Sequence, residues 1–151
     1  MIVGDPFPVK KAKKLNIRKK FWMRESYWSA MHYGGGQPPE QMHNYYRLAD
    51  LVVVPSQVEE AFCMVAVEAM AAGKPVLASQ KGGISEFVLE GITGYHLAEP
   101  MTSESILADI KRVLADADRA QIAKNARNFV FSKYSWEHVT QRFEAQIQDW
   151  F

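Results

Sequence analysis

Two glutamates frame a stretch whose residue types could bind a sugar. In EEAFCMVAVEAMAAGKPVLAS, residues 59–79, Glu60 and Glu68 are separated by seven residues that are all apolar or small. A carboxylate can accept two hydrogen bonds from a vicinal diol, so each glutamate is suited to hold sugar hydroxyls. Two glutamates at this spacing also occur by chance on helices. The spacing alone leaves both interpretations open.

The helix expected over 64–72 should present its amino end to a ligand. Helix-forming residues dominate this range, and Gly73, followed by a proline two residues later, suits a helix end. The first amides of a helix have no partner within it and carry the positive end of its dipole. The backbone around Cys63, Met64 and Val65 is therefore a predicted site for an anion such as a diphosphate.

Strands and helices alternate along the chain, which determines where this stretch should lie. The run LVVVPS, residues 51–56, is continuous and β-branched, as in strands buried on both faces of a parallel sheet. The alternation predicts an α/β fold, a Rossmann-like doubly wound parallel sheet with flanking helices. Ligands of such sheets bind beyond the carboxyl ends of the strands, where residues 57–63 should emerge. The expected elements are a short apolar run at 1–4, strands at 26–33, 51–56, 75–79 and 94–97, and helices at 9–21, 40–50, 64–72, 103–115 and 119–134, with a final helix capped by Ser135.

Composition narrows the class of protein. A chain of 151 residues fits one domain, and a net charge of +1 gives no reason to expect nucleic acid as a partner. One cysteine excludes an internal disulfide and suits a reducing compartment. Without a charged-then-apolar leader or an apolar run of about 18 residues, a cytoplasmic protein is expected. A solvated helix face is the favoured interpretation of the basic run at 10–20, and peripheral contact with anionic lipid or a polyanionic acceptor is the alternative.

Three segments together resemble a known family. YYRLADLVVVPS, the stretch at 59–79 and GGISEFVLEGITGYHLAEP are similar to the carboxy-terminal domain of the retaining glycosyltransferases of family four, also called group 1, which have the GT-B fold. The matching features are two glutamates with seven residues between them after a Pro-Ser strand end, a Glu-Ala-Met-Ala-x-Gly-x-Pro-Val turn, Gly-Gly-Ile-x-Glu and Thr-Gly. The resemblance covers most of the chain and is strongest from Tyr45 to Pro100.

The resemblance implies a function and a role for each matching residue. It implies transfer of a sugar, with retention, from a nucleotide-diphosphate sugar donor to a glycan or lipid-linked acceptor, with no cofactor and no metal. Glu60, the one candidate catalytic residue, would contact the donor sugar, and Glu68 would hold the ribose diol. The loop around Tyr33 and Gly34 would lie at the nucleobase. The implied donor-binding set is Tyr33, Gly34, Glu60, Ala61, Phe62, Cys63, Met64, Val65 and Glu68.

The chain departs from the family pattern in ways that bear on activity. Ala61 and Cys63 stand where the family usually has glycines, so a methyl and a thiol could crowd the sugar. The family's first strand and helix, with an arginine and a lysine that neutralise the diphosphate, are expected to be missing. An alternative alignment puts Lys10 at that lysine, but Asp5 then replaces the arginine. The acceptor-binding domain is also expected to be missing.

These departures leave two hypotheses for a single domain over 1–151, truncated at its amino end. It is either a donor-binding glycosyltransferase domain or a catalytically inactive remnant that acts as a binding or assembly module. A partner is expected in both cases, either a separate acceptor-binding domain or a second copy that associates through the terminal helix. That helix carries a stripe formed by Val139, Phe143, Ile147 and Trp150.

Overall fold

The structure is a computed structural model, and it describes residues 2–3 and 33–148. The chain divides into two compact units, Met1–Met42 and His43–Phe151. The helix predicted over 9–21, all but the last residue of the strand predicted over 26–33, and Trp150 lie outside the described residues.

The first unit contains a short parallel pair of strands. β1 (Ile2–Val3) pairs with β2 (Tyr33–Gly35), with Ile2 opposite Tyr33 and Val3 opposite Gly35. Tyr33, the last residue of the strand predicted over 26–33, does lie in a strand, but the expectation of a loop from Gly34 onward was wrong, because β2 continues through Gly35. Backbone pairing with β1 keeps these residues extended despite the low strand preference of glycine. Helix α4 (Pro39–Leu48) begins in this unit and ends in the second.

The second unit is built on a parallel sheet with flanking helices, as predicted. Strands β3 (Val52–Val54), β4 (Val76–Ala78) and β5 (Tyr95–His96) lie in that order, with Val53 opposite Leu77 and Leu77 opposite Tyr95. The central strand β4 is fully buried. The helices are α5 (Met64–Ala71), α6 (Ser103–Ala115), α7 (Arg119–Tyr134) and α8 (Trp136–Gln148), and a 3₁₀ turn, η1, spans Gly83–Glu86.

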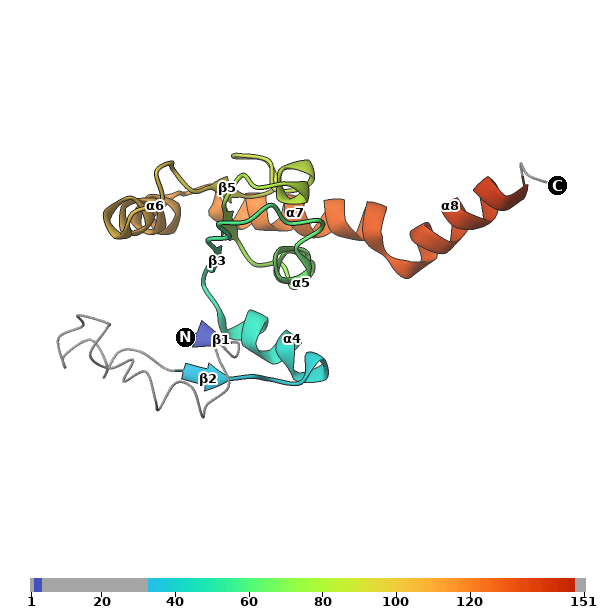
Figure 1. Cartoon of the computed structure of the whole chain (residues 1–151), viewed down its shortest axis with the longest axis horizontal. Coiled ribbons are helices and arrows are strands. Elements are labelled where there is room, and N and C mark those ends of the chain that lie inside the picture. Colours follow the sequence, from blue (N-terminus) through green and yellow to red (C-terminus); the bar gives the residue numbers. More distant parts are fainter. Residues whose placement is uncertain (1, 4–32, 149–151) are drawn as a thin grey trace. The chain divides into compact units, whose positions relative to one another are not determined.

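Helices cover both sides of this sheet. Figure 1 shows α5 and α6 on opposite sides of the strands, and both helices contact β4. Leu77 of β4 packs with Tyr95, with Val113 of α6 and with Ile122 of α7 in one apolar cluster. Helix α7 also packs along α5, where the Arg127 guanidinium donates to the carbonyl of Ala71 over 2.9 Å. Because β4 is covered on both faces, its all-apolar sequence is explained.

Local signals set the ends of the helices. Gly73, with φ +71°, and Lys74 donate their amides to the carbonyls of Met70 and Ala69, a Schellman motif that stops α5. Ser135 caps α8 as predicted, because its hydroxyl accepts from the amide of His138 over 3.4 Å. These ends agree with the expected ranges to within a residue or two.

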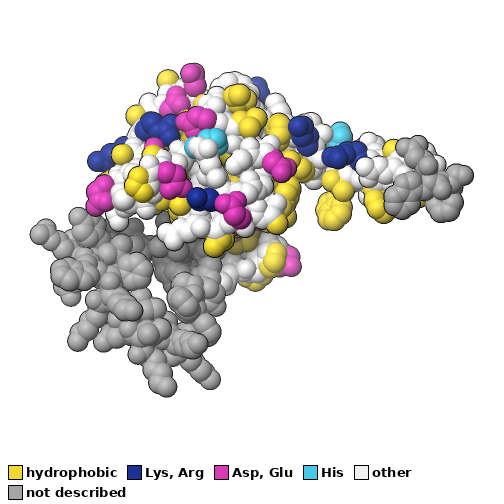
Figure 2. All heavy atoms as spheres, turned by 45° about the horizontal axis from the view of Figure 1, so that its top comes forward, with side chains coloured by type: hydrophobic (Ala, Val, Ile, Leu, Met, Phe, Trp, Pro, Cys, Tyr) yellow, Lys and Arg dark blue, Asp and Glu magenta, His cyan; other side chains and the backbone are white. Residues whose placement is uncertain are grey.

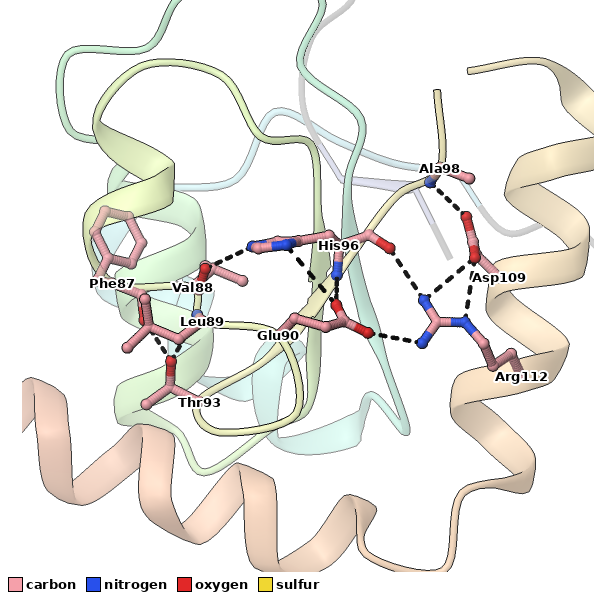
Figure 3. A network of polar contacts seen from close by, with 9 residues as sticks. All are labelled: Phe87, Val88, Leu89, Glu90, Thr93, His96, Ala98, Asp109 and Arg112. Carbon is pink, nitrogen blue, oxygen red and sulfur yellow. Dashed lines mark hydrogen bonds and ion pairs between the residues drawn. The ribbon is translucent and has the colours of Figure 1, made fainter. Parts of the chain in front are cut away.

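A polar network joins β5 to α6 (Figure 3). The guanidinium of Arg112 donates to Glu90 Oε1 over 2.9 Å, to the carbonyl of His96 over 3.0 Å and to Asp109 Oδ1 over 3.2 Å. Glu90 also accepts from the amide of His96, and the buried Asp109 accepts from the amide of Ala98 over 2.8 Å. The network therefore holds the segment after β5 against α6.

Helix α8 keeps an apolar face exposed. Trp136 is 84% exposed and Phe143 is 62% exposed, and none of the described α8 residues is buried. Figure 2 shows hydrophobic side chains along the arm that this helix forms. In the part of the chain that the structure describes, no helix is both long and apolar enough to cross a membrane.

Asp109→Ala should lower the free energy of unfolding by about 1–3 kcal/mol, because it removes hydrogen bonds to a buried carboxylate. Urea unfolding followed by circular dichroism measures the change. Glu104→Ala, an exposed change on the same helix, is the control and should stay within about 0.5 kcal/mol of the parent. Equal losses for the two variants would show that the network contributes nothing to stability.

Candidate functional site

The candidate site begins where the segments after β3 and β4 meet. Both segments leave the carboxyl edge of neighbouring parallel strands, so their backbones run side by side. Glu60 forms an isolated parallel bridge with Gly82, and the amide of Gly83 donates to the carbonyl of Glu60 over 2.7 Å. The Gly-Gly pair therefore supports the segment that carries the first glutamate.

This contact requires glycine at both positions. A Cβ on Gly82 would lie 2.4 Å from the carbonyl oxygen of Glu60, and one on Gly83 would lie 2.3 Å from that of Ala61. Gly82 also has φ +56°, a conformation that side chains disfavour. The Gly-Gly-Ile-x-Glu motif thus has a structural reason in this chain, which the sequence did not reveal.

The carboxylate of Glu60 is held within its own loop. Ser56, two residues after β3, donates its hydroxyl to Glu60 Oε1 over 2.6 Å. Both residues are half-buried. The main chain and the side chain of Glu60 are therefore both tethered, one by Gly83 and the other by Ser56.

The carboxylate of Glu68 is held from another helix. Tyr46 of α4 donates its phenol hydroxyl to Glu68 Oε2 over 2.9 Å. Tyr46 is 6% exposed, and burial, followed by the hydrogen bond to Glu68 and its charge, raises the pKa of the phenol well above its ordinary value. The phenol thus stays protonated and remains a donor at any physiological pH.

Helix α5 begins with an open amino end. Its N-cap is Cys63, whose carbonyl accepts from the amides of Ala66 and Val67 over 3.1 and 3.4 Å. The amides of Met64 and Val65 precede these bonded ones. The side chains of Met64 and Val65 are 57% and 47% exposed, so solvent reaches this end. The predicted anion site therefore corresponds to the amino end of α5.

Cys63 takes the conformation that glycine usually supplies. It has φ +44°, in the left-handed region, which costs a residue with a side chain about 1–2 kcal/mol. Its thiol is buried, and burial raises the pKa of the thiol, with a further contribution from the charge of Glu60. Cys63 therefore adopts, despite its side chain, the left-handed conformation that glycine adopts more readily.

The ring of Phe62 belongs to an aromatic cluster. Its centroid lies 5.7 Å from that of Phe87 and 5.2 Å from that of Tyr134, at the end of α7. Phe62 thus anchors the loop to the core, a role that the sequence did not predict. Neighbouring Ala61 is exposed.

Most of the predicted donor-binding residues lie on the one segment from Glu60 to Glu68. The structure also shows two residues that contact the predicted glutamates and that sequence reasoning missed. Tyr46 was assigned only to the helix expected over 40–50 and Ser56 only to the end of the strand expected over 51–56, and no local pattern links either residue to a glutamate. Tyr33 and Gly34 belong to the first unit, and their proximity to a nucleobase stays a prediction.

Comparisons with known proteins identify the family. The family model for glycosyl transferases group 1 matches residues 2–129. The chain therefore belongs to this family and is a group 1 glycosyltransferase domain with the architecture of GT-B enzymes.

One relative and two solved structures illustrate the match. Lipopolysaccharide 1,2-N-acetylglucosaminetransferase of Salmonella typhimurium is 63% identical over 100% of this chain, which spans 40% of that protein. HepE of Anabaena in complex with UDP has a TM-score of 0.81 and 26% identity, over 97% of this chain and 40% of HepE. Sucrose-phosphate synthase of Thermosynechococcus elongatus has a TM-score of 0.78 and 29% identity, over 99% of this chain and 37% of the synthase.

Gly82→Ala should destabilise the fold more than Gly91→Ala does. Both glycines have positive φ, but a Cβ on Gly91 meets nothing within 4 Å, whereas one on Gly82 meets the Glu60 carbonyl. Overpacking adds about 1–3 kcal/mol to the shared conformational cost. Urea unfolding of both variants measures the difference, and equal losses would mean that the approach of the two segments is not tight.

Cys63 should react slowly with iodoacetamide in the native protein. Because its pKa is raised, less thiolate is present at pH 8 than in a free thiol, and burial hinders access. The rate should rise only above the ordinary thiol pKa and should reach that of a free thiol in urea. Mass spectrometry follows the alkylation. A native rate equal to the rate in urea would contradict the buried position.

Proposed function

We propose that this chain supplies the donor-binding part of a transferase that moves N-acetylglucosamine from UDP-N-acetylglucosamine to a lipopolysaccharide acceptor. The sugar and the acceptor follow from the name of the relative that is 63% identical. The nucleotide follows from the UDP and UDP-glucose complexes of HepE, which has 26% identity. The same comparisons favour a transferase over the non-catalytic remnant.

The observation that carries this proposal is the pair of tethered carboxylates on either side of an open helix end. The diphosphate would accept hydrogen bonds from the amides of Met64 and Val65, at the positive end of the α5 dipole. Glu68, one turn into the helix, would hold the ribose diol. Glu60, on the loop before the helix, would accept from hydroxyls of the sugar.

The same arrangement would assist the reaction. As the bond between the sugar and the diphosphate breaks, negative charge grows on the leaving group, and amides that already point at it stabilise the transition state. No protein nucleophile is proposed for the retaining transfer. The described residues contain no group of three or more His, Cys, Asp or Glu that could hold a metal ion, and a reaction without metal stays part of the proposal.

The acceptor would be bound outside this segment. The chain spans 40% of the Salmonella relative, and transfer requires both reactants to be held together. We therefore propose a second domain or chain that binds the acceptor, with the exposed apolar face of α8 as its candidate contact.

In calorimetric titration, the wild-type chain should bind UDP more tightly than GDP or ADP. Glu68→Ala should lower the affinity for UDP about ten- to a hundredfold, which is the range for losing hydrogen bonds to a charged group. Glu104→Ala, an exposed glutamate on α6, is the control and should bind as wild type. No heat with any of the three nucleotides would refute a nucleotide site in this chain. UDP binding that survives Glu68→Ala would mean that the ribose lies elsewhere.

A further inference from the structure

In each of the two glutamates, one carboxylate oxygen accepts a hydrogen bond from a hydroxyl of the second unit. Tyr46 donates to Glu68 Oε2 over 2.9 Å, and Ser56 donates to Glu60 Oε1 over 2.6 Å. Neither hydroxyl bonds to the other oxygen, Oε1 of Glu68 or Oε2 of Glu60. Among the described residues, each carboxylate thus has one oxygen bonded to a hydroxyl, and the other oxygen is an acceptor for which no bond within this part of the chain is seen.

The tether on Glu68 is rigid. Tyr46 is a residue of the second unit and is only 6% exposed, so the phenol oxygen has little freedom to move. Tyr46 and Glu68 are 22 residues apart and lie on different helices, so the hydrogen bond limits the rotamer of a side chain that α5 alone would leave free. A bond that a phenol donates to a carboxylate is charge-assisted and therefore stronger than one between two neutral groups.

The tether on Glu60 is local. Ser56 lies four residues before Glu60 in the same loop, and the Glu60 carbonyl is bonded to the amide of Gly83. With its backbone and one carboxylate oxygen both held, Glu60 can direct the second oxygen without reorganising the loop. Preorganisation of this kind lowers the entropy lost when a ligand binds.

We propose that Tyr46 and Ser56 are positioning residues for the donor: Tyr46 orients Glu68 toward the ribose, and Ser56 orients Glu60 toward the transferred sugar. This inference rests on the proposed function and deepens it. Because the two glutamates serve different parts of the donor, removal of the two hydroxyls should have separable effects.

Tyr46→Phe keeps the buried ring and removes only the hydroxyl. It should weaken UDP binding about three- to tenfold in calorimetric titration, the cost of ordering one freed side chain when the ligand binds. In a Glu68→Ala background the same change should have no further effect, because Tyr46 would act only through Glu68. Tyr45→Phe is the matched control, since the hydroxyl of the adjacent Tyr45 makes no bond to Glu68 in the described structure.

Ser56→Ala tests the proposed role of Ser56 in binding the transferred sugar of the donor. UDP should bind to this variant as to wild type, whereas the affinity ratio of UDP-N-acetylglucosamine to UDP should fall about three- to tenfold. Ser56→Thr retains a hydroxyl and should restore the ratio. A merely structural role for Ser56 would instead weaken both ligands equally.

The outcomes separate this inference from the proposed function. If UDP fails to bind the wild-type chain, both are overturned. If Glu68→Ala abolishes UDP binding but Tyr46→Phe does not weaken it, only the positioning role is overturned. The positioning role is also overturned if Tyr46→Phe lowers the affinity for UDP as much in the Glu68→Ala background as in wild type. It is overturned too if Ser56→Ala leaves the affinity ratio of UDP-N-acetylglucosamine to UDP unchanged.

Discussion

The close packing of Glu60 and Ala61 on Gly82 and Gly83 is the constraint on which the rest of the site depends. Parallel pairing of β3 with β4 brings the two segments out at one edge of the sheet, and the absence of side chains on both glycines lets the backbones come within hydrogen-bonding distance. The loop that precedes α5 is thereby held against the segment after β4. This contact holds the backbone of Glu60 just before the amino end of that helix, whereas the carboxylate of Glu68 is held by Tyr46.

A second set of interactions holds the side chains around this backbone contact. Hydroxyls from a strand end and from a separate helix each hold one oxygen of a glutamate. The ring of Phe62 ties the same loop to Tyr134 of α7, so the loop has an apolar anchor as well. Polar tethers decide where the carboxylates point, and aromatic packing keeps the loop on the core. The hydrogen bonds of the two glutamates and the packing of Phe62 thus involve different side chains of neighbouring residues.

The network around Arg112 serves the fold rather than this site. It joins β5 and the segment after it to α6 through Glu90 and Asp109, and its charged groups bond to one another and to backbone. Charges in such a network are already paired, so they offer little to a ligand. The glutamates of the candidate site differ because, within residues 33–148, only one oxygen of each is bonded to a hydroxyl.

The sequence by itself determined the elements and the family. The β-branched run at 51–56, the Gly73 helix end and the Ser135 cap depend on neighbours within a few residues, so their periodicity and turn chemistry can be read directly. Tertiary structure alone decided that Tyr46 bonds to Glu68, that Phe62 packs on Tyr134, that Cys63 adopts positive φ and that β2 continues through Gly34. Most of these depend on contacts between residues far apart in the chain, which strand pairing and helix packing create and no local pattern encodes.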